Sequence, residues 1–325
     1  MLTRRSALSV PFAMPALHRA AAAPGDAGDF PSRPVRVILP YAAGGQADTI
    51  ARVMQPRMSE ALGQPVVIEN RTGAGGSIGG GIVAASPPDG YTLLFDAASF
   101  LIVPLAVRGL PFDYETAFAP VGLVAEQPYV LAVSPSMGVS DLAGFLAAAR
   151  AGSEPIAYGT PGIGSIGHLA GALLATRAGI QLEHVAYRGG ADVSRDMAAG
   201  TLRMGILSYN SIGPLVQDGR ARALGVTSGI RRGDRRIPTI AENGFPGFEV
   251  TSWTGVFARA GTPPAILHKL AAACNHATAD ATVRERLIAI GSEATEAQPE
   301  AFAARLVTER EVVKGIVREA RIVFQ

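Results

Sequence analysis

The chain alternates between short runs of branched apolar residues and longer stretches with apolar residues at helical spacing, separated by glycine-containing turns. The first unit begins with Val35–Leu39, whose apolar run between two prolines predicts a buried strand. The turn Gly44-Gly45 follows, and apolar residues three or four apart from Ile50 to Met58 predict a helix with Asp48 as its N-cap. A strand, a tight turn and a helix form the repeating unit of α/β folds.

The same unit recurs along the chain and predicts largely parallel sheets. Further strands are predicted at 65–70, 91–95, 121–124, 129–133, 155–158, 182–187, 203–206, 223–227 and 248–257. Helices are predicted at 77–85, 141–150, 168–178, 191–199, 263–279, 281–290 and 299–320. Because ligands of open α/β sheets bind at the carboxyl ends of the strands, the turns after these strands are candidate binding elements.

The strand-turn-helix theme occurs in two series, which predicts two α/β lobes with a ligand cleft between them. Lobe 1 is expected to comprise 24–127 plus 250–325, and lobe 2 to comprise 128–249. The chain is expected to cross between the lobes near 126–130 and 246–252, where a hinge would close the cleft.

The first residues have the order of an export signal rather than of a folded element. Arg4 and Arg5 precede a short apolar stretch, Ala7–Leu17, and the small residues Ala20–Ala23 follow. We expect removal of residues 1–23 and export to the periplasm, and the paired arginines also fit a twin-arginine signal. No later stretch reaches the length of a membrane span.

Composition and charge exclude several classes of function. The 325-residue chain has a net charge of +2, and loss of the signal would remove three arginines and no acid, so a polybasic surface for nucleic acid is not expected. The basic cluster Arg231–Arg236 contains an acid and predicts a solvated loop. The single cysteine, Cys274, rules out an internal disulfide, and the histidines lack ligand spacing, so neither a metal nor a cofactor is expected.

The first glycine turn is a candidate seat for an anion. Gly44 and Gly45 let the backbone turn with no Cβ in the way, and the first N–H groups of the following helix lack partners within that helix. The helix dipole favours a negative charge at the same place. The pattern alone leaves two interpretations open, an anion-binding turn and an ordinary strand-to-helix connector.

Eight segments, in their order and spacing, resemble the extracytoplasmic solute receptors of tripartite tricarboxylate transporters, often called the Bug family. They are Phe30–Arg36, Pro40–Asp48, Glu69–Gly76, Pro88–Leu94, Gly164–Leu169, Tyr187–Ala191, Ile237–Gly244 and Trp253–Gly255. The resemblance covers the whole chain after the signal. It implies a type II-like, two-lobed periplasmic binding protein that is not an enzyme, each lobe a mainly parallel sheet flanked by helices. Such a receptor delivers a small organic carboxylate (a di- or tricarboxylate, an acidic amino acid or an aromatic acid) to the membrane permease subunits of a tripartite tricarboxylate transporter.

By the same resemblance, the turns 41–48 of lobe 1 and 159–168 of lobe 2 hold the ligand from opposite sides through backbone N–H groups, hydroxyls and water. The expected ligand-binding residues are Tyr41, Ala43, Gly44, Gly45, Asp48, Gly75, Ser99, Gly159, Thr160, Gly162, Gly164, Ser165, His168, Tyr187, Gly189 and Asp192. Asp48 is expected to brace its turn, and a structural bond to a neighbouring loop is favoured for His168 over ligand contact. Differences from the family pattern leave the identity of the carboxylate open; they are Asp192, Arg203 and Leu207-Ser208.

Two motifs suggest an exported or cytoplasmic α/β enzyme instead. Gly162–Gly167 matches the G-x-G-x-x-G pattern of NAD(P)-binding oxidoreductases, but the acid expected at the end of the next strand is replaced by Glu183, near the start of that strand. Gly75–Gly79 matches the G-x-S-x-G pattern of serine hydrolases around Ser77, but the preceding strand ends at Asn70, too early for a nucleophile elbow. Both enzyme classes stay as alternatives to the receptor.

Overall fold

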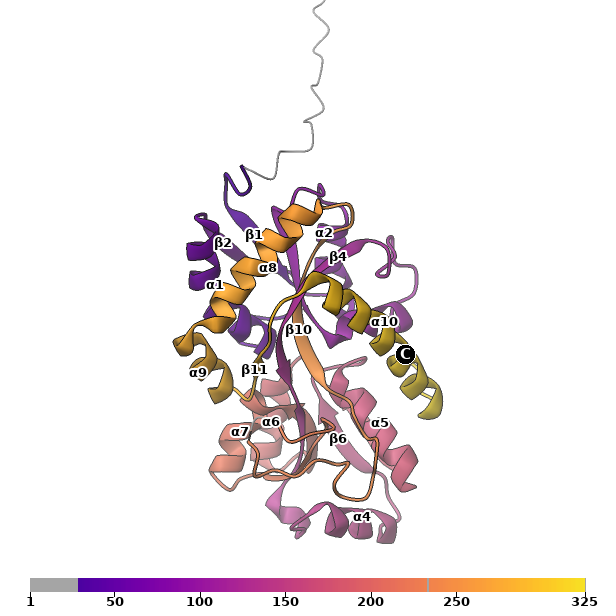
Figure 1. Cartoon of the computed structure of the whole chain (residues 1–325). Helices are drawn as coiled ribbons and strands as arrows, with labels where there is room; N and C mark the ends of the chain where they lie inside the picture. Colours follow the sequence, from indigo (N-terminus) through magenta and orange to yellow (C-terminus); the bar gives the residue numbers. More distant parts are fainter. Residues whose placement is uncertain (1–28, 233, 325) are drawn as a thin grey trace, which may run out of the picture.

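The computed structural model describes residues 29–232 and 234–324, and its strands form two sheets. Sheet A contains β1 Val35–Leu39, β2 Val66–Asn70, β3 Thr92–Ala97, β4 Phe118–Gln127, β10 Ser252–Arg259 and β11 Glu293–Ala294. Sheet B contains β5 Tyr129–Val133, β6 Ile156–Thr160, β7 Leu182–Ala186, β8 Met204–Ser208 and β9 Arg222–Val226. The strand orders are β11-β4-β10-β3-β1-β2 and β7-β6-β8-β5-β9. Figure 1 shows the resulting two lobes, with the long strands β4 and β10 extending from sheet A toward sheet B.

Both sheets have the same internal order, in which one antiparallel strand is inserted among parallel ones. In sheet A, β1 pairs in parallel with β2 and β3, and β10 lies antiparallel between β3 and β4. In sheet B, β6 pairs in parallel with β7 and β8, and β5 lies antiparallel between β8 and β9. The inserted strand is in each case the one that arrives from the other lobe, because β5 follows β4 and β10 follows the strands of sheet B. The sheets are therefore mainly parallel, as the sequence predicts, and each contains an inserted antiparallel strand that the sequence does not predict.

Helices cover both faces of both sheets. They are α1 Gln46–Leu62, α2 Ser77–Ala84, α3 Val103–Ala106, α4 Leu142–Ala151, α5 Ile166–Ala178, α6 Gly190–Ala199, α7 Tyr209–Gln217, α8 Pro264–Ala279, α9 Ala281–Ala289 and α10 Pro299–Glu319. Alternate residues of a strand point to opposite faces, so Val37 and Leu39 of β1 pack with α1 and α8, whereas Ile38 belongs to the apolar cluster that includes α2 and α10. In sheet B, Leu131 packs on the side of α4 and α5, and Val130 on the side of α6 and α7.

One buried apolar cluster runs through both lobes. It includes Trp253 and Phe257 of β10 in sheet A, and Leu131 and Ile206 in sheet B. Phe248, on the segment that leads into β10, belongs to the same cluster. The two lobes therefore share a continuous core on one face of each sheet.

The start of α1 differs from the prediction. The N-cap of α1 is Gly45, and the helix begins at Gln46, so Asp48 lies inside the first turn. The Asp48 carboxylate accepts a hydrogen bond from the backbone N–H of Gly44, which folds the turn back onto the helix. The acid therefore braces the turn from within the helix and does not cap it.

Helix α7 is absent from the sequence-based prediction. Gly213 and Pro214 interrupt its helical pattern, but Ile212 and Leu215 are buried against sheet B and hold the segment helical. Within the described ranges, no helix has the combination of length and hydropathy that crossing a membrane requires.

Candidate functional site

Six strand ends lead into helix starts, three on each sheet. In lobe 1, β1, β2 and β3 are followed by α1, by a short 3-10 turn before α2, and by a 3-10 turn over residues 98–101 before α3. In lobe 2, β6, β7 and β8 are followed by α5, α6 and α7. The first N–H groups of a helix have no intrahelical acceptor, and the positive end of the helix dipole lies there. Each lobe therefore presents a row of hydrogen-bond donors suited to an anion.

The turn after β1 is exposed to solvent, and the buried side chain of Asp48 holds it in place. Residues 42–45 are exposed, and Gly44 has a φ of 80°, a conformation that favours glycine. Asp48 is 2% exposed and accepts hydrogen bonds from Gly44 N at 2.9 Å, from Asn70 Nδ2 at 2.8 Å and from Arg52 Nε at 2.9 Å. Burial alone would raise the pKa of Asp48, but these bonds together hold it below its ordinary value. The turn is thus fixed by an ionised Asp48, whose carboxylate oxygens already accept hydrogen bonds from these three partners.

Tyr41 and Ser99 join the ends of β1 and β3. The Tyr41 hydroxyl donates to Asp96 Oδ1 at 2.5 Å and lies 2.5 Å from Ser99 Oγ. Asp96 is 2% exposed, and burial raises its pKa to about 6. Gly75, in the turn after β2, is exposed, and a Cβ at this position would lie 3.6 Å from Val107.

The turn after β6 is engaged with the protein itself. The Ser165 hydroxyl caps α5 by accepting the N–H of His168, and Gly164 N donates to His168 Nδ1, both at 3.3 Å. Gly164 is buried, and a Cβ at this position would approach Ile102 of lobe 1 to 3.2 Å. This turn therefore forms part of the contact between the lobes, and Gly162 in the same turn is half-buried, with a φ of 140°.

Two of the expected lobe 2 contacts are structural. Gly159 is buried in β6, where a Cβ would lie 2.7 Å from Val193. Thr160 has no exposed surface, and its hydroxyl lies 2.7 Å from His184 Nε2. Both residues are buried by these contacts, and the contact with a ligand that the sequence predicts for them stays a prediction.

The turns after β7 and β8 supply the remaining groups of lobe 2. Gly189 is the N-cap of α6 in extended conformation, and the space beside its Cα is open. Tyr187 donates to Asp196 at 2.9 Å, and Asp192 forms an ion pair with Arg195 at 2.9 Å on the same helix.

The start of α7 was not among the expected ligand-binding segments. There, Ser208 donates to the Asn210 side chain at 2.6 Å and Ser211 lies against Gly190. A serine at a strand end with an asparagine two residues later, Ser208 and Asn210, was the available signal.

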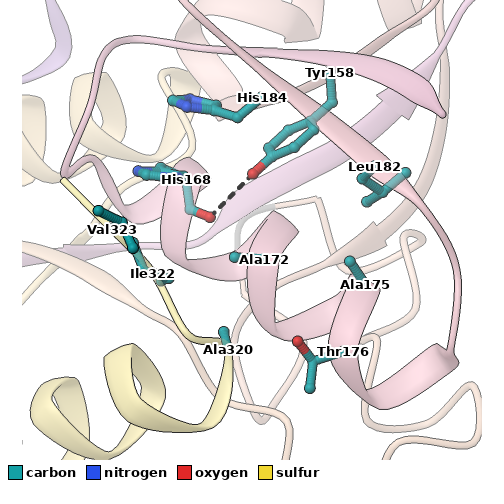
Figure 2. A pocket seen from close by; sticks show the side chains of 10 residues that line it. All are labelled: Tyr158, His168, Ala172, Ala175, Thr176, Leu182, His184, Ala320, Ile322 and Val323. Carbon is teal, nitrogen blue, oxygen red and sulfur yellow. Dashed lines mark hydrogen bonds between the residues drawn. The ribbon is translucent and has the colours of Figure 1, made fainter. Parts of the chain in front are cut away.

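A cavity of about 250 Å³ lies where the chain after α10 meets lobe 2 (Figure 2). Its walls come from α5, β6, β7 and the chain after α10, including Ile322 and Val323. The rings of His168 and His184 stack with centroids 3.9 Å apart, and Tyr158 donates to the His168 carbonyl oxygen at 3.3 Å. Burial lowers the pKa of each imidazole to about 4, which keeps both rings neutral. His168 thus makes a structural hydrogen bond to its own turn, and its contact with a ligand stays a prediction.

The two enzyme motifs lack the surroundings that their chemistry needs. The space at Gly164, which a dinucleotide phosphate would occupy, is taken by Ile102, Ala106 and Phe324. Ser77 is buried and donates its proton to the Ala74 carbonyl oxygen at 2.9 Å. Among residues 29–232 and 234–324, no group of three or more histidine, cysteine or acidic side chains is arranged to hold a metal ion.

A chain of ion pairs lies where the lobes meet. Glu126, at the end of β4, is 7% exposed and pairs with Arg305 of α10 at 2.5 Å and with Arg232 of lobe 2 at 2.7 Å. Arg305 also pairs with Glu309, which accepts the indole N–H of Trp253 at 2.6 Å. The predicted solvated loop 231–236 is therefore anchored at Arg232, which is only 24% exposed.

Comparison with known proteins agrees with this architecture. The family described as "Tripartite tricarboxylate transporter family receptor" matches residues 50–321. A UPF0065 protein from the tcbD-tcbE intergenic region of Pseudomonas sp. strain P51 is 39% identical over 295 residues, covering 90% of this chain and 88% of the relative. BugT of Bordetella pertussis is 33% identical over 304 residues and covers 92% of each chain. The solved structure of R. palustris Rpa4515 with adipate has a TM-score of 0.84 at 33% identity, covering 91% of this chain and 99% of that one.

Proposed function

We propose a function from the premise that this chain belongs to the tripartite tricarboxylate transporter receptor family, the Bug proteins. It is a periplasmic solute receptor. Its ligand is a small organic carboxylate, the class to which the adipate and the malate found with two R. palustris relatives belong. The receptor delivers this ligand to the membrane permease subunits of a tripartite transporter and carries out no chemical reaction on it.

The exposed, braced turn at residues 42–45 is the observation that carries the proposal. It combines backbone donors at a helix start with the absence of bulky side chains, and its acid, Asp48, is occupied by Arg52 and Asn70. The N–H groups of Gly44 and Gly45 are used within the turn, so a carboxylate bound here meets the first N–H groups of α1 and the positive end of its dipole. For the opposite wall we propose the starts of α6 and α7 on lobe 2, where the space beside the Gly189 Cα is open.

Ligand binding is tested by a thermal-shift and calorimetry panel of di- and tricarboxylates, acidic amino acids and aromatic acids. A ligand at one hundred times its dissociation constant stabilises the native state by about 2.7 kcal/mol. NAD and NADP complete the panel as the test of the oxidoreductase alternative. Failure of every carboxylate, or micromolar binding of a dinucleotide, would contradict the receptor proposal.

The location of the site is tested by a matched pair of substitutions at Ala43, whose side chain is exposed in the turn. Ala43→Asp adds a negative charge beside the proposed carboxylate-binding site, and electrostatic repulsion should weaken carboxylate binding at least tenfold. Ala43→Asn has nearly the same shape without the charge and should leave binding within about threefold of the parent. Equal effects of the two variants would place the carboxylate elsewhere.

Export and hinge motion complete the proposal. Residues 1–23, outside the described ranges, are removed during export, so intact-mass analysis of periplasmic protein should show their loss.

Lobe 1 (24–127 plus 250–325) and lobe 2 (128–249) close on the ligand about the crossings near 126–130 and 246–252.

A further inference from the structure

We infer that Ser99 presents only hydrogen-bond acceptors to the ligand, so that the site selects carboxylates that also carry a hydroxyl or ammonium donor. The inference rests on the proposed function, because it specifies the ligand class at the same site. It follows from the direction of the hydrogen bonds that link Ser99, Tyr41 and Asp96.

Asp96 fixes the direction of the hydrogen bonds at the buried end of this series of linked side chains. Its Oδ1 accepts the Tyr41 hydroxyl at 2.5 Å and the N–H of Ala97 at 2.7 Å. Burial raises the pKa of Asp96 to about 6, so at pH 8 the carboxylate is ionised and has no proton to donate. Burial, with the added charge of Asp96, also raises the pKa of Tyr41, which therefore keeps its proton. The single proton of Tyr41 is thus committed to Asp96.

Ser99 must then donate to Tyr41. The two oxygens are 2.5 Å apart, and this separation requires one proton between them. Tyr41 has none left to give, and its oxygen also accepts the N–H of Ala97 at 3.2 Å. A serine hydroxyl carries one proton and two lone pairs. With its proton directed at Tyr41, Ser99 has only lone pairs for a ligand.

Ser99 lies where a ligand between the lobes would reach it. It is half-buried and follows β3, the direct parallel neighbour of β1, whose own end leads into the exposed turn 42–45. Ile102, three residues further, contacts the lobe 2 turn at Gly164. The exposed turn therefore supplies donors for a carboxylate, and Ser99 supplies an acceptor beside it. A ligand that matches both must combine a carboxylate with a donor group.

Titration calorimetry at pH 8 with L-malate, L-aspartate and succinate tests this selection, because the three share a four-carbon dicarboxylate skeleton and differ at one carbon. One neutral hydrogen bond corresponds to a factor of about 2 to 12 in affinity. We expect malate, whose donor is a neutral hydroxyl, to bind about fivefold more tightly than succinate, and aspartate, whose donor is a charged ammonium, to gain at least as much. Ser99→Ala should bring this ratio to near one, and Ser99→Thr, which keeps the hydroxyl, should restore it.

Tyr41 is a positioning residue in this scheme, and its removal should change selectivity rather than only affinity. Tyr41→Phe releases the Ser99 proton, so the ratio should fall to one or shift in favour of succinate. Tyr114→Phe is the matched control. The Tyr114 hydroxyl is buried near Asp96 and makes no hydrogen bond among the described residues, so its loss should leave the ratio unchanged.

The outcomes separate this inference from the receptor proposal. Binding of all three acids with equal affinity, or a preference of the parent for succinate, would overturn the acceptor role of Ser99 and leave the receptor proposal intact. No binding of any carboxylate would overturn both. If Ser99→Ala fails to fold, Ser99→Thr decides, because loss of the ratio in that variant would show that the hydroxyl direction is not the cause.

Discussion

At the residue scale, the stacked imidazoles of His168 and His184 should make the protein sensitive to acid. Burial lowers the pKa of both from 6.5 to about 4, and the neighbouring imidazole lowers that of His184 further. Between these values the unfolded chain binds more protons than the native protein, so stability falls as the pH drops from about 6.5 to about 4. The loss should amount to about 1–3 kcal/mol for each imidazole, depending on how well water screens it.

The measurement is the melting temperature of His184→Gln and of the parent from pH 7.5 to pH 4.5. The variant should lose less stability on acidification, and the exposed His268→Gln on α8 serves as control and should follow the parent. Asp96 has the opposite effect on stability over this pH range. Its raised pKa makes the native state bind a proton that the unfolded chain does not bind, so this group stabilises the protein as the pH falls. Because the parent and the variant both contain Asp96, its contribution cancels when their melting temperatures are compared. Parallel curves for all three proteins would contradict the assignment.

Single residues were predictable from the sequence where the interaction is local. Asp48 braces its turn, as expected from an aspartate next to a helix start. Ser165, which the sequence predicts at the ligand, accepts the N–H of His168 as the cap of α5. The burial of Thr160 could not be predicted, because it depends on His184, which is 24 residues away on another strand. Arg232 was misjudged for the same reason, since its partner Glu126 lies on the other lobe.

At the scale of elements, the segment after α10 acts as a strap from lobe 1 to lobe 2. Helix α10 packs on β4 and also on α5, and Arg177 of α5 forms an ion pair with Glu319 at its end. Beyond it, the Phe324 ring meets His168 edge-on, with centroids 6.0 Å apart. Figure 1 shows α10 running from sheet A along this side of the molecule toward α5.

Phe324→Ala should therefore destabilise the protein by about 1–2 kcal/mol, because it removes a partly buried ring from the contact between the lobes. Val323→Ala, at a neighbouring side chain that is 70% exposed, should cost less than about 0.5 kcal/mol. Urea denaturation of both variants measures the difference. Equal midpoints would show that the strap contributes nothing to stability.

Most elements were predictable because hydrophobic periodicity is a local property. Helices such as α8 and α10 begin and end within a residue of their predicted bounds. The direction of β5 and β10 was not predictable, because a strand pattern is identical in both directions and only the crossing between lobes decides it. Helix α7 was missed because tertiary burial of Ile212 outweighs the local effect of Pro214.

At the scale of the whole molecule, the two-lobed organisation was predictable from the repeated theme, and the coupling between the lobes was not. Ion pairs through Glu126 and the contact of Gly164 with Ile102 join segments far apart in sequence. No local pattern indicates which face of a lobe will meet the other. The sequence therefore predicts two units, whereas the structure adds the contacts through which they meet.

The continuous apolar cluster across both sheets also determines how the protein melts. If Trp253, Phe257, Leu131 and Ile206 lose their neighbours together, neither half can persist once the other has unfolded. Differential scanning calorimetry should then record one endotherm whose calorimetric and van't Hoff enthalpies agree. Two resolved endotherms would mean that each half is a separate cooperative unit. A protein whose two lobes are proposed to close about a hinge would then still unfold on heating as one cooperative unit.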